Sequence, residues 1–427
     1  MSKFITVKLN ELAAPGRSVI SGPFGSNIGQ RFFKTHGVPI IRGNNLTTDY
    51  KKFNDDGFVF LTEEKADELK SDAIKGDILF TAAGTIGQVG MIPQSAKYDR
   101  YVISNKQLRF RIDPEKADPD YVYYWLASPW IYKTIIARNT GSTVPLINLG
   151  IIKSLPVSLP KDIVEQKKIA SILANIDEKI ALNNRINTEL EAIAKTLYDY
   201  WFVQFDFPDA NGKPYKTSGG KMEYNTTLKR EIPAGWRASN ILSLANLLGG
   251  GTPTKTKPEY WNGSIPFFTP TDSDKNIYSL NTQDSITDLG LKNSSTRLFE
   301  KNTIFITARG SVGRLALNAV PMAMNQSCYA LKAKQGVSFA FLYFLTKELI
   351  NHLEVKATGS VFNSIISNDI EYTYLALPED NGLIDKYAKK TELAFAKIEL
   401  LTKENQHLIE LRDWLLPLLM NGQVTVK

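Results

Sequence analysis

Two loops of related sequence carry side chains that could form hydrogen bonds with the edges of nucleic-acid bases. Residues 80–87, Phe-Thr-Ala-Ala-Gly-Thr-Ile-Gly, match residues 306–313, Ile-Thr-Ala-Arg-Gly-Ser-Val-Gly, and Arg309 stands where the first copy has Ala83. An arginine guanidinium can donate two hydrogen bonds to O6 and N7 of guanine, and an Asn or Gln carboxamide can pair in the same way with N6 and N7 of adenine. A shared loop whose polar side chains differ fits two surfaces that bind different targets.

The same chemistry defines a larger set of candidate nucleic-acid contacts. The candidates for base contacts are Arg42, Asn44 and Asn45 in the first half of the chain, and Arg309, Arg314, Asn325 and Gln326 in the second half. The candidates for phosphate contacts, which position a protein on a duplex, are Lys106, Lys255, Lys257, Gly84, Thr85, Thr143 and Ser360. For each residue alone, a role in a turn or on a solvated surface is the alternative interpretation. The Gly-x-x-Gly loop at Gly84 is also typical of a tight turn between strands.

Residue types that carry catalysis are sparse. The chain has one cysteine, Cys328, and its three histidines, His36, His352 and His407, are far apart in the sequence. It has no Pro-Pro dipeptide to hold a flipped adenine, no Phe-x-Gly-x-Gly signature for a methyl donor and no Gly-x-x-x-x-Gly-Lys-(Ser/Thr) phosphate loop. We therefore expect no catalytic residue, no metal site and no bound cofactor in this chain.

Charge and composition favour a polyanionic partner. The 427 residues carry a formal net charge of +7 and the chain has a pI of about 9.0, which suits neutralisation of phosphates. A role of this charge in solubility alone is the alternative. Residues 1–10 lack the apolar region of a signal peptide, and the chain has no run of about 18 uncharged apolar residues. We therefore expect a cytoplasmic protein.

These candidates belong to a chain that was duplicated as a whole. The Thr-Gly-Ser segment at residues 140–142 recurs at residues 358–360, and Leu159-Pro160 recurs as Leu377-Pro378, both after 218 positions. Each copy consists of a variable part rich in β-branched, aromatic and turn residues, the Thr-Gly-Ser loop, a short strand and a long helix. Aromatic groups at residues 121–125 and 339–344 could stack on bases, but their apolar density favours elements packed on each domain core.

Steps of four and three residues predict one long helix in each copy, with an apolar seam along it. The first seam is Ile169, Leu173, Ile176, Ile180, Asn183, Asn187, Leu190, Ala194, Leu197 and Trp201. The second seam, 218 residues later at every position, is Tyr387, Thr391, Ala394, Ile398, Leu401, Asn405, Leu408, Arg412, Leu415 and Leu419. We expect the two helices to pair with each other, and the equivalent residues Asn187 and Asn405 to fix their register. The stretch between Pro160 and Asp206 has no Pro or Gly, so a helix of about 40 residues and about 60 Å is possible. Such a helix is more typical of a spacer than of a domain core.

The predicted fold class is α+β, with two homologous globular domains joined by two long antiparallel coiled-coil helices. The first domain covers residues 1–160 and the first helix covers residues 161–206. Turn signals predict a linker at residues 207–235. The second domain then covers residues 236–380, and the second helix covers residues 381–427.

This organisation resembles the specificity subunit of Type I restriction-modification systems over nearly the whole chain. The local motifs are Tyr-Asp-Tyr-Trp-Phe at residues 198–202 with Lys-Pro-Tyr at 213–215, Glu-Ile-Pro-Ala-Gly-Trp at 231–236, Gly-Gly-Thr-Pro at 250–253 and Tyr-Trp-Asn-Gly-Ser-Ile-Pro at 260–266. They look like the central conserved region of that family and the opening of a second target-recognition domain.

The resemblance implies a non-catalytic DNA-binding subunit of a restriction system. Each recognition domain would read one half of a bipartite site in double-stranded DNA, and the helices would set the gap and dock two modification subunits. Those subunits would flip the target base and methylate it with S-adenosylmethionine, and restriction subunits with translocase and nuclease activity would complete the complex. Two alternatives are a self-contained DNA adenine methyltransferase, which the missing motifs disfavour, and a coiled-coil adaptor without a role on DNA.

Overall fold

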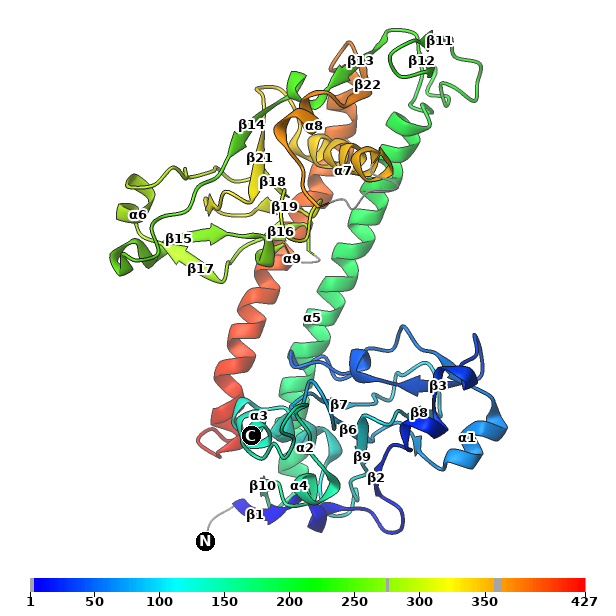
Figure 1. The fold of residues 1–427 in the computed structure, drawn as a ribbon, viewed down its shortest axis with the longest axis vertical. Coiled ribbons are helices and arrows are strands. Elements are labelled where there is room, and N and C mark those ends of the chain that lie inside the picture. Colours follow the sequence, from blue (N-terminus) through cyan, green and yellow to red (C-terminus); the bar gives the residue numbers. More distant parts are fainter. Residues whose placement is uncertain (1–3, 274–275, 357–362, 427) are drawn as a thin grey trace. The chain divides into compact units, whose positions relative to one another are not determined.

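The computed structural model describes residues 4–273, 276–356 and 363–426 (Figure 1). The chain divides into two compact units, Met1–Ala181 with His407–Lys427 as unit 1, and Leu182–Gln406 as unit 2. Each unit combines small sheets, short helices and parts of two long helices, which confirms the α+β prediction. Within the described ranges, every helix is too short or too polar to span a lipid bilayer.

Unit 1 contains two four-stranded sheets. The first sheet has the order β2 (Val19–Ser21), β9 (Gln107–Phe110), β6 (Ile78–Thr81) and β7 (Val89–Met91), and all neighbours are antiparallel. The second sheet has the order β4 (Phe60–Leu61), β3 (Val38–Ile41), β8 (Tyr101–Ile103) and β5 (Asp72–Ala73), and β3 and β8 run parallel. A separate antiparallel pair joins β1 (Phe4–Lys8) to β10 (Pro156–Pro160).

The helices of unit 1 cover these sheets. They are α1 (Glu63–Leu69), α2 (Pro119–Leu126), α3 (Pro129–Ala137) and α4 (Leu149–Lys153). Both α2 and α3 begin with a capping side chain followed by proline at the first helical position: Asp118 accepts from the Tyr121 N–H, and Ser128 accepts from the Ile131 N–H. Every residue from Tyr121 to Leu126 is buried in the main core of the unit. The interpretation of this aromatic group as a packed core element is therefore confirmed.

Unit 2 repeats this plan. Its five-stranded sheet has the order β14 (Ala245–Gly249), β21 (Cys328–Ala333), β18 (Ile304–Thr307), β19 (Leu315–Asn318) and β16 (Tyr278–Ser279). A three-stranded sheet has the order β17 (Asp284–Ile286), β15 (Trp261–Phe268) and β20 (Ala323–Met324), and β15 and β20 run parallel, as β3 and β8 do in unit 1. The pair β13 (Trp236–Asn240) and β22 (Tyr374–Pro378) corresponds to β1 and β10.

The short helices of unit 2 are α6 (Asp288–Lys292), α7 (Phe339–Lys356) and α8 (Ser367–Glu371). Helix α7 is a continuous helix of 18 residues where unit 1 has α2 and α3. The physical reason is that Ser128 and Pro129 end one helix and start another in unit 1, whereas α7 contains no proline. Its aromatic residues, including Phe341 and Phe344, are buried, so the second aromatic group also belongs to a core.

Two long helices run through the chain, as predicted. Helix α5 (Ile163–Tyr198) has 36 residues and continues into a π-helical turn (Asp199–Val203), and α9 (Gly382–Met420) has 39 residues. They are antiparallel within each unit: in unit 1 Asp177 contacts Arg412, and in unit 2 Asn187 contacts Thr402 and the Tyr387 hydroxyl donates to the Ala194 carbonyl (Figure 1). The paired residue numbers rise in one helix as they fall in the other.

Turn residues predict a linker between the first long helix and the second domain, and part of this segment forms regular structure. It contains a hairpin, β11 (Met222–Asn225) with β12 (Arg230–Pro233), which pairs in antiparallel register. Phe207 stacks on the rings of Tyr215 and Trp236 at centroid distances of 4.6 and 5.6 Å. Phe207 and Trp236 also pack on a small cluster formed by the buried Phe205, Ile232 and Ala376, so the turn residues connect ordered elements here.

Candidate nucleic-acid interface

Four loops meet at one edge of the first sheet of unit 1, and we call them loop edge 1: residues 22–28, 83–87, 104–106 and 140–146. They meet because β2 and β6 end where their neighbour β9 begins. The Gly22 N–H donates to the Gln107 carbonyl at 2.9 Å and the Ala82 N–H to the Lys106 carbonyl at 2.7 Å. The Gly84 N–H donates to the Pro145 carbonyl at 2.9 Å, which ties in the loop that carries Thr143.

The equivalent loops of unit 2 meet in the same way, and we call them loop edge 2: residues 250–257, 308–314, 325–327 and 363–365. The Gly251 N–H donates to the Met324 carbonyl at 3.0 Å, and the Ala308 N–H donates to the Ser327 carbonyl at 2.9 Å. Arg309 forms an isolated β-bridge with Ser364. Loop edge 2 therefore contains Lys255, Lys257, Arg309, Arg314, Asn325 and Gln326, whereas Ser360 lies outside the described residues.

The exposed candidates at these edges are free to approach a ligand. Thr85, Lys106 and Thr143 are exposed at loop edge 1, and Lys255 and Arg309 are exposed at loop edge 2. The Gly84 and Gly310 backbones have positive φ angles of 86° and 66°, so both loops are tight turns that glycine makes easily. Because the Gly84 N–H is already bonded to Pro145, this amide does not point to a phosphate.

Four further candidates use their polar groups within the protein. The Asn325 Oδ1 accepts from the Ser327 N–H at 3.0 Å, and Gln326 accepts from the Thr252 hydroxyl. The Lys257 Nζ donates to the Tyr260 hydroxyl at 3.1 Å, and the Arg314 Nη1 donates to the Ser273 carbonyl at 3.3 Å. Because Gln326, Lys257 and Arg314 are exposed, these single bonds leave their remaining donors available.

The Arg42, Asn44 and Asn45 candidates lie beside loop edge 1, because the Ser104 N–H donates to the Ile41 carbonyl at 2.9 Å. Asn44 is exposed, but Asn45 is fully buried and its amide donates to the carbonyls of Asn54 and Asp56. Asn45 is therefore occupied in holding its own loop and does not present its amide to a base in this conformation. The Arg42 guanidinium donates to the Gly57 carbonyl at 3.1 Å.

The equivalent turn of unit 2, residues 269–272, is not among the candidates predicted from the sequence. The Arg42 N–H donates to the Asn45 side chain at 2.9 Å, and the Thr269 N–H donates in the same way to Asp272 at 2.8 Å. Thr271 is exposed in this turn, which follows β15 as Arg42 follows β3. This turn could have been found from the sequence. The turn residues Thr-Pro-Thr-Asp at 269–272 follow an apolar strand, as Arg-Gly-Asn-Asn at 42–45 does in the first copy.

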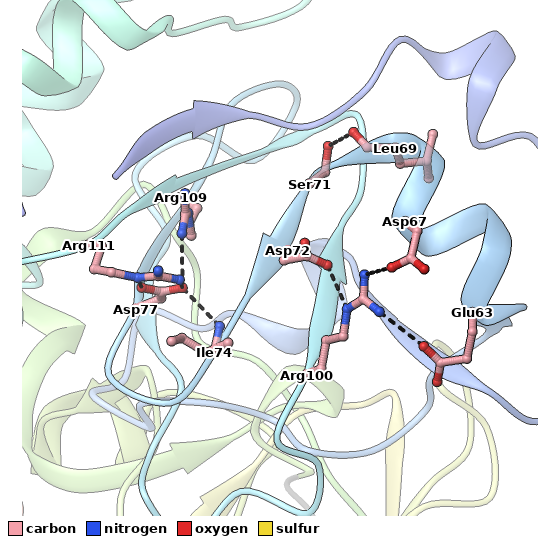
Figure 2. A network of polar contacts seen from close by, with 10 residues as sticks. All are labelled: Glu63, Asp67, Leu69, Ser71, Asp72, Ile74, Asp77, Arg100, Arg109 and Arg111. Atoms are coloured by element: carbon pink, nitrogen blue, oxygen red, sulfur yellow. Dashed lines mark hydrogen bonds and ion pairs between the residues drawn. The ribbon is translucent and has the colours of Figure 1, made fainter. Parts of the chain in front are cut away.

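Other basic residues of unit 1 form ion pairs with acidic side chains of the same domain, as Figure 2 shows. The Arg100 guanidinium donates to Glu63, Asp67 and Asp72 at 2.7 to 3.0 Å, so it ties α1 to β5. The Arg111 guanidinium donates twice to the buried Asp77, whose hydrogen bond raises the pKa of that arginine. Arg109 also contacts Asp77, and burial lowers its pKa. These arginines build the domain, so net charge alone does not locate the interface.

The long helices pair through a polar centre in unit 2. The Asn183 amide donates to Asn405 at 2.8 Å and to Glu404 at 2.9 Å, and the Asn405 amide donates to Asn184 at 2.8 Å. Asn183 and Asn187 are buried, and the Oδ1 atom of each is buried without a hydrogen bond. Among the predicted seam residues, Ile169, Leu173, Ile176, Asn187, Ile398, Leu401 and Asn405 are buried, and Ile180, Leu190, Leu197, Leu408 and Leu415 are partly buried.

Comparison with known proteins identifies the family. The model of the family described as Type I restriction modification DNA specificity domain matches the chain twice, over residues 29–192 and residues 233–407. The first match contains the 83–87, 104–106 and 140–146 loops of loop edge 1, and the second match contains all four loops of loop edge 2. The chain therefore belongs to the family of Type I restriction-modification specificity subunits, with two copies of the DNA specificity domain.

Individual relatives agree over most of the chain. The specificity subunit of the Type I restriction enzyme HindI from Haemophilus influenzae is 25% identical over 407 residues, which cover 82% of this chain and 87% of that protein. The specificity subunit of MjaIX from Methanocaldococcus jannaschii is 26% identical over 357 residues, covering 83% of this chain and 78% of that protein. The crystal structure of the S subunit from M. genitalium has the same fold, with a TM-score of 0.57 at 16% identity, and covers 97% of this chain and 96% of that chain.

Proposed function

We propose that each specificity domain of this chain reads one half of a bipartite site in double-stranded DNA. The observation that carries this proposal is the duplicated loop edge, where the same backbone turns present different polar side chains. Loop edge 1 has Ala83 where loop edge 2 has the exposed Arg309. The exposed Arg314 stands where the first copy has Gln88, whose carboxamide is bonded to Thr81 and Leu46 within its own domain. Because Arg and carboxamide side chains select different bases, two edges with one scaffold and different side chains suit two different half-sites.

Base contacts and phosphate contacts come from different side chains of each loop edge. Arg309 and Arg314 are the main candidates for base contacts at loop edge 2, and Asn44 is a candidate beside loop edge 1. Lys106 is exposed at loop edge 1 and Lys255 is exposed at loop edge 2. A phosphate contact at each would fix the register of its domain on the duplex. Lys257 keeps a hydrogen bond to Tyr260 and is the weaker of the two lysine candidates in its loop.

The long helices are proposed to set the gap between the half-sites and to dock two modification subunits. Exposed apolar side chains support the docking: Leu182 and Leu400 occupy equivalent positions of the repeat, and so do Ile193 and Leu411. A contact surface present once in each repeat fits two copies of one partner. Exposed apolar residues on a helix that is otherwise paired along its seam suit a protein interface.

Catalysis is proposed to reside in the partner subunits. The modification subunits would bind S-adenosylmethionine and methylate a flipped base, and restriction subunits would supply translocation and cleavage. Chromosomal and invading DNA both lie in the cytoplasm of a prokaryotic cell, which supports the same location for this chain.

The test is salt-dependent DNA binding by the chain assembled with its modification subunits. Affinity for a duplex that carries the methylated site should fall as salt rises, and Lys255→Ala should weaken binding to all sequences alike and reduce the salt slope by about one ion. Lys221→Ala is the matched control, because Lys221 is an exposed lysine of the β11–β12 hairpin paired with Glu223. An assembled complex whose affinity does not depend on salt would favour a protein adaptor instead.

A further inference from the structure

One aromatic side chain at loop edge 1 is not explained by folding. Phe24 follows β2 and its side chain is 84% exposed, more than any other large apolar side chain among the described residues. A single exposed apolar residue is ordinary on a protein surface. Phe24 differs because its loop is rigidly held and because its neighbours are the candidate DNA contacts.

The loop around Phe24 is fixed on both sides of the ring. Before it, the Gly22 N–H donates to the Gln107 carbonyl at 2.9 Å, and a Cβ at Gly22 would overlap the Ser104 carbonyl. After it, the Asn27 N–H donates to the Phe24 carbonyl at 2.9 Å, and the Ile28 side chain is buried. A side chain with two rotatable bonds on a pinned backbone loses little entropy when it binds.

The ring stands among polar groups suited to nucleic acid. A Cβ at Gly25 would lie 3.1 Å from the Asn105 Nδ2, so the next loop runs directly beside Phe24. Asn105 and Lys106 are both exposed in that loop, and the Lys106 carbonyl connects it to the Gly84 turn. The Phe24 ring could therefore contact a base step while the Asn105 amide and the Lys106 ammonium group contact the phosphates beside it.

Unit 2 keeps the scaffold but not the ring. A Cβ at Gly250 would overlap the Asn325 carbonyl, so Gly250 makes the same close approach as Gly22. The residue two positions later is Thr252 in place of Phe24, and its hydroxyl donates to Gln326. The loop therefore forms without an aromatic residue, which separates the ring from the folding of the loop.

We propose that Phe24 is a wedge that stacks on a base step within the half-site read by the first specificity domain. An apolar side chain that enters between base pairs partly unstacks them, which selects for steps that deform easily. This inference rests on the proposed function, and it gives the first domain a DNA contact that the second domain lacks, because Thr252 stands in place of Phe24 and bonds Gln326 within the protein.

The experiment uses the chain assembled with its modification subunits and a duplex carrying the methylated site. 2-Aminopurine is placed in turn at each position of the two half-sites, away from the methylated base, because base flipping also changes its fluorescence. The wild-type complex should raise fluorescence at one step of one half-site. Phe24→Ala should abolish that rise and weaken binding by about 5- to 150-fold, the range of base–aromatic stacking, whereas Phe24→Trp should retain both.

Two controls keep the outcomes separate. Because the Phe24 ring is exposed, Phe24→Ala should leave the thermal unfolding midpoint unchanged, and Thr252→Ala should leave the fluorescence rise in place. If the wild-type complex binds its site and no position brightens, or if Phe24→Ala binds as the wild type does, the wedge is wrong. If the wild-type complex neither binds nor methylates any bipartite site, the proposed function itself fails.

Discussion

The ion pair of Arg412 with Asp177 is buried in unit 1, and the equivalent positions of unit 2 hold two apolar residues. We therefore predict that an apolar pair can replace the ion pair, whereas loss of the arginine alone destabilises unit 1. The Arg412 side chain is 6% exposed; its Nη1 donates to Asp177 at 2.9 Å, and its guanidinium lies 4.2 Å from the centre of the Tyr50 ring. At the equivalent positions of the repeat, 218 residues away, Arg412 corresponds to Ala194 and Asp177 corresponds to Phe395. Both of these are buried in the core of unit 2.

We expect Arg412→Ala to destabilise unit 1 by about 3–5 kcal/mol, because it leaves the Asp177 carboxylate buried without its partner. Burial already raises the pKa of Asp177, although hydrogen bonds from Tyr124 and Arg412 oppose that rise. Adding Asp177→Phe to Arg412→Ala copies the apolar pair of unit 2 at similar total volume. The double variant should recover most of the loss, to within about 1.5 kcal/mol of the wild type.

The assay is hydrogen exchange of the α2 and β9 amides, read by mass spectrometry as a function of urea, since these elements belong to unit 1 and the two units need not unfold together. The matched control is Phe395→Ala in unit 2, which should lower protection of α7 by the cost of a cavity, about 3–5 kcal/mol. An Arg412→Ala protein as stable as the wild type would show that the ion pair does not hold unit 1 together, and a double variant no more stable than the single one would show that an apolar pair cannot replace it.

Three other predictions follow from the helices and the segment after them. Asn187→Leu should stabilise the helix pair by about 1 kcal/mol in urea unfolding, because the buried Asn187 Oδ1 has no hydrogen bond. The variant should also allow alternative helix registers, detectable as mixed oligomers, whereas a loss of stability would show that the Asn187 amide is fully hydrogen-bonded. A heptad inserted after Leu190 adds about 10 Å to the helix, so methylation mapping should show both half-sites unchanged and a gap lengthened by no more than about three base pairs. A gap of unchanged length would exclude the helices as the spacer, and an insertion of two residues should damage folding. Thr217→Val should raise the pKa of Asp206, which hydrogen bonds from the Thr217 hydroxyl and N–H hold below the ordinary value. In the wild type the stabilising effect of these bonds is present at neutral pH and is lost as pH falls through the lowered pKa. Identical NMR titrations of Asp206 in the two proteins would show that the Thr217 hydroxyl does not lower this pKa.

The long helices were predictable because their apolar seams are periodic and recur in both copies. Every seam position repeats after 218 residues, and α5 contains no Pro or Gly to end it. The hairpin at β11 and β12 was not predicted because turn residues dominate this short segment, while Ile232 of the hairpin packs in one cluster with Phe205 and Ala376, which are distant in sequence. Local propensity does not contain such contacts.

The candidate site was predictable as a set of loops and not as a set of side chains. Alignment of the two copies located the Gly84 and Gly310 turns, because a shared backbone needs glycine at the same places. It did not separate Asn44, which is exposed, from Asn45, which is buried and bonded to backbone carbonyls. Phe24 was missed because a lone phenylalanine in a sequence usually belongs to a core.

Mapping of methylated bases shows whether each specificity domain reads its own half of a split DNA site. DNA is exposed to the chain with its modification subunits, once with the wild type and once with Arg309→Ala. The wild type should yield one bipartite motif with an unspecified gap. Arg309→Ala should relax one position of one half-site, at a cost of about 1–3 kcal/mol there, and leave the gap and the other half unchanged. A wild-type motif without a gap, or a variant that changes both halves together, would show that the two domains do not read separate half-sites.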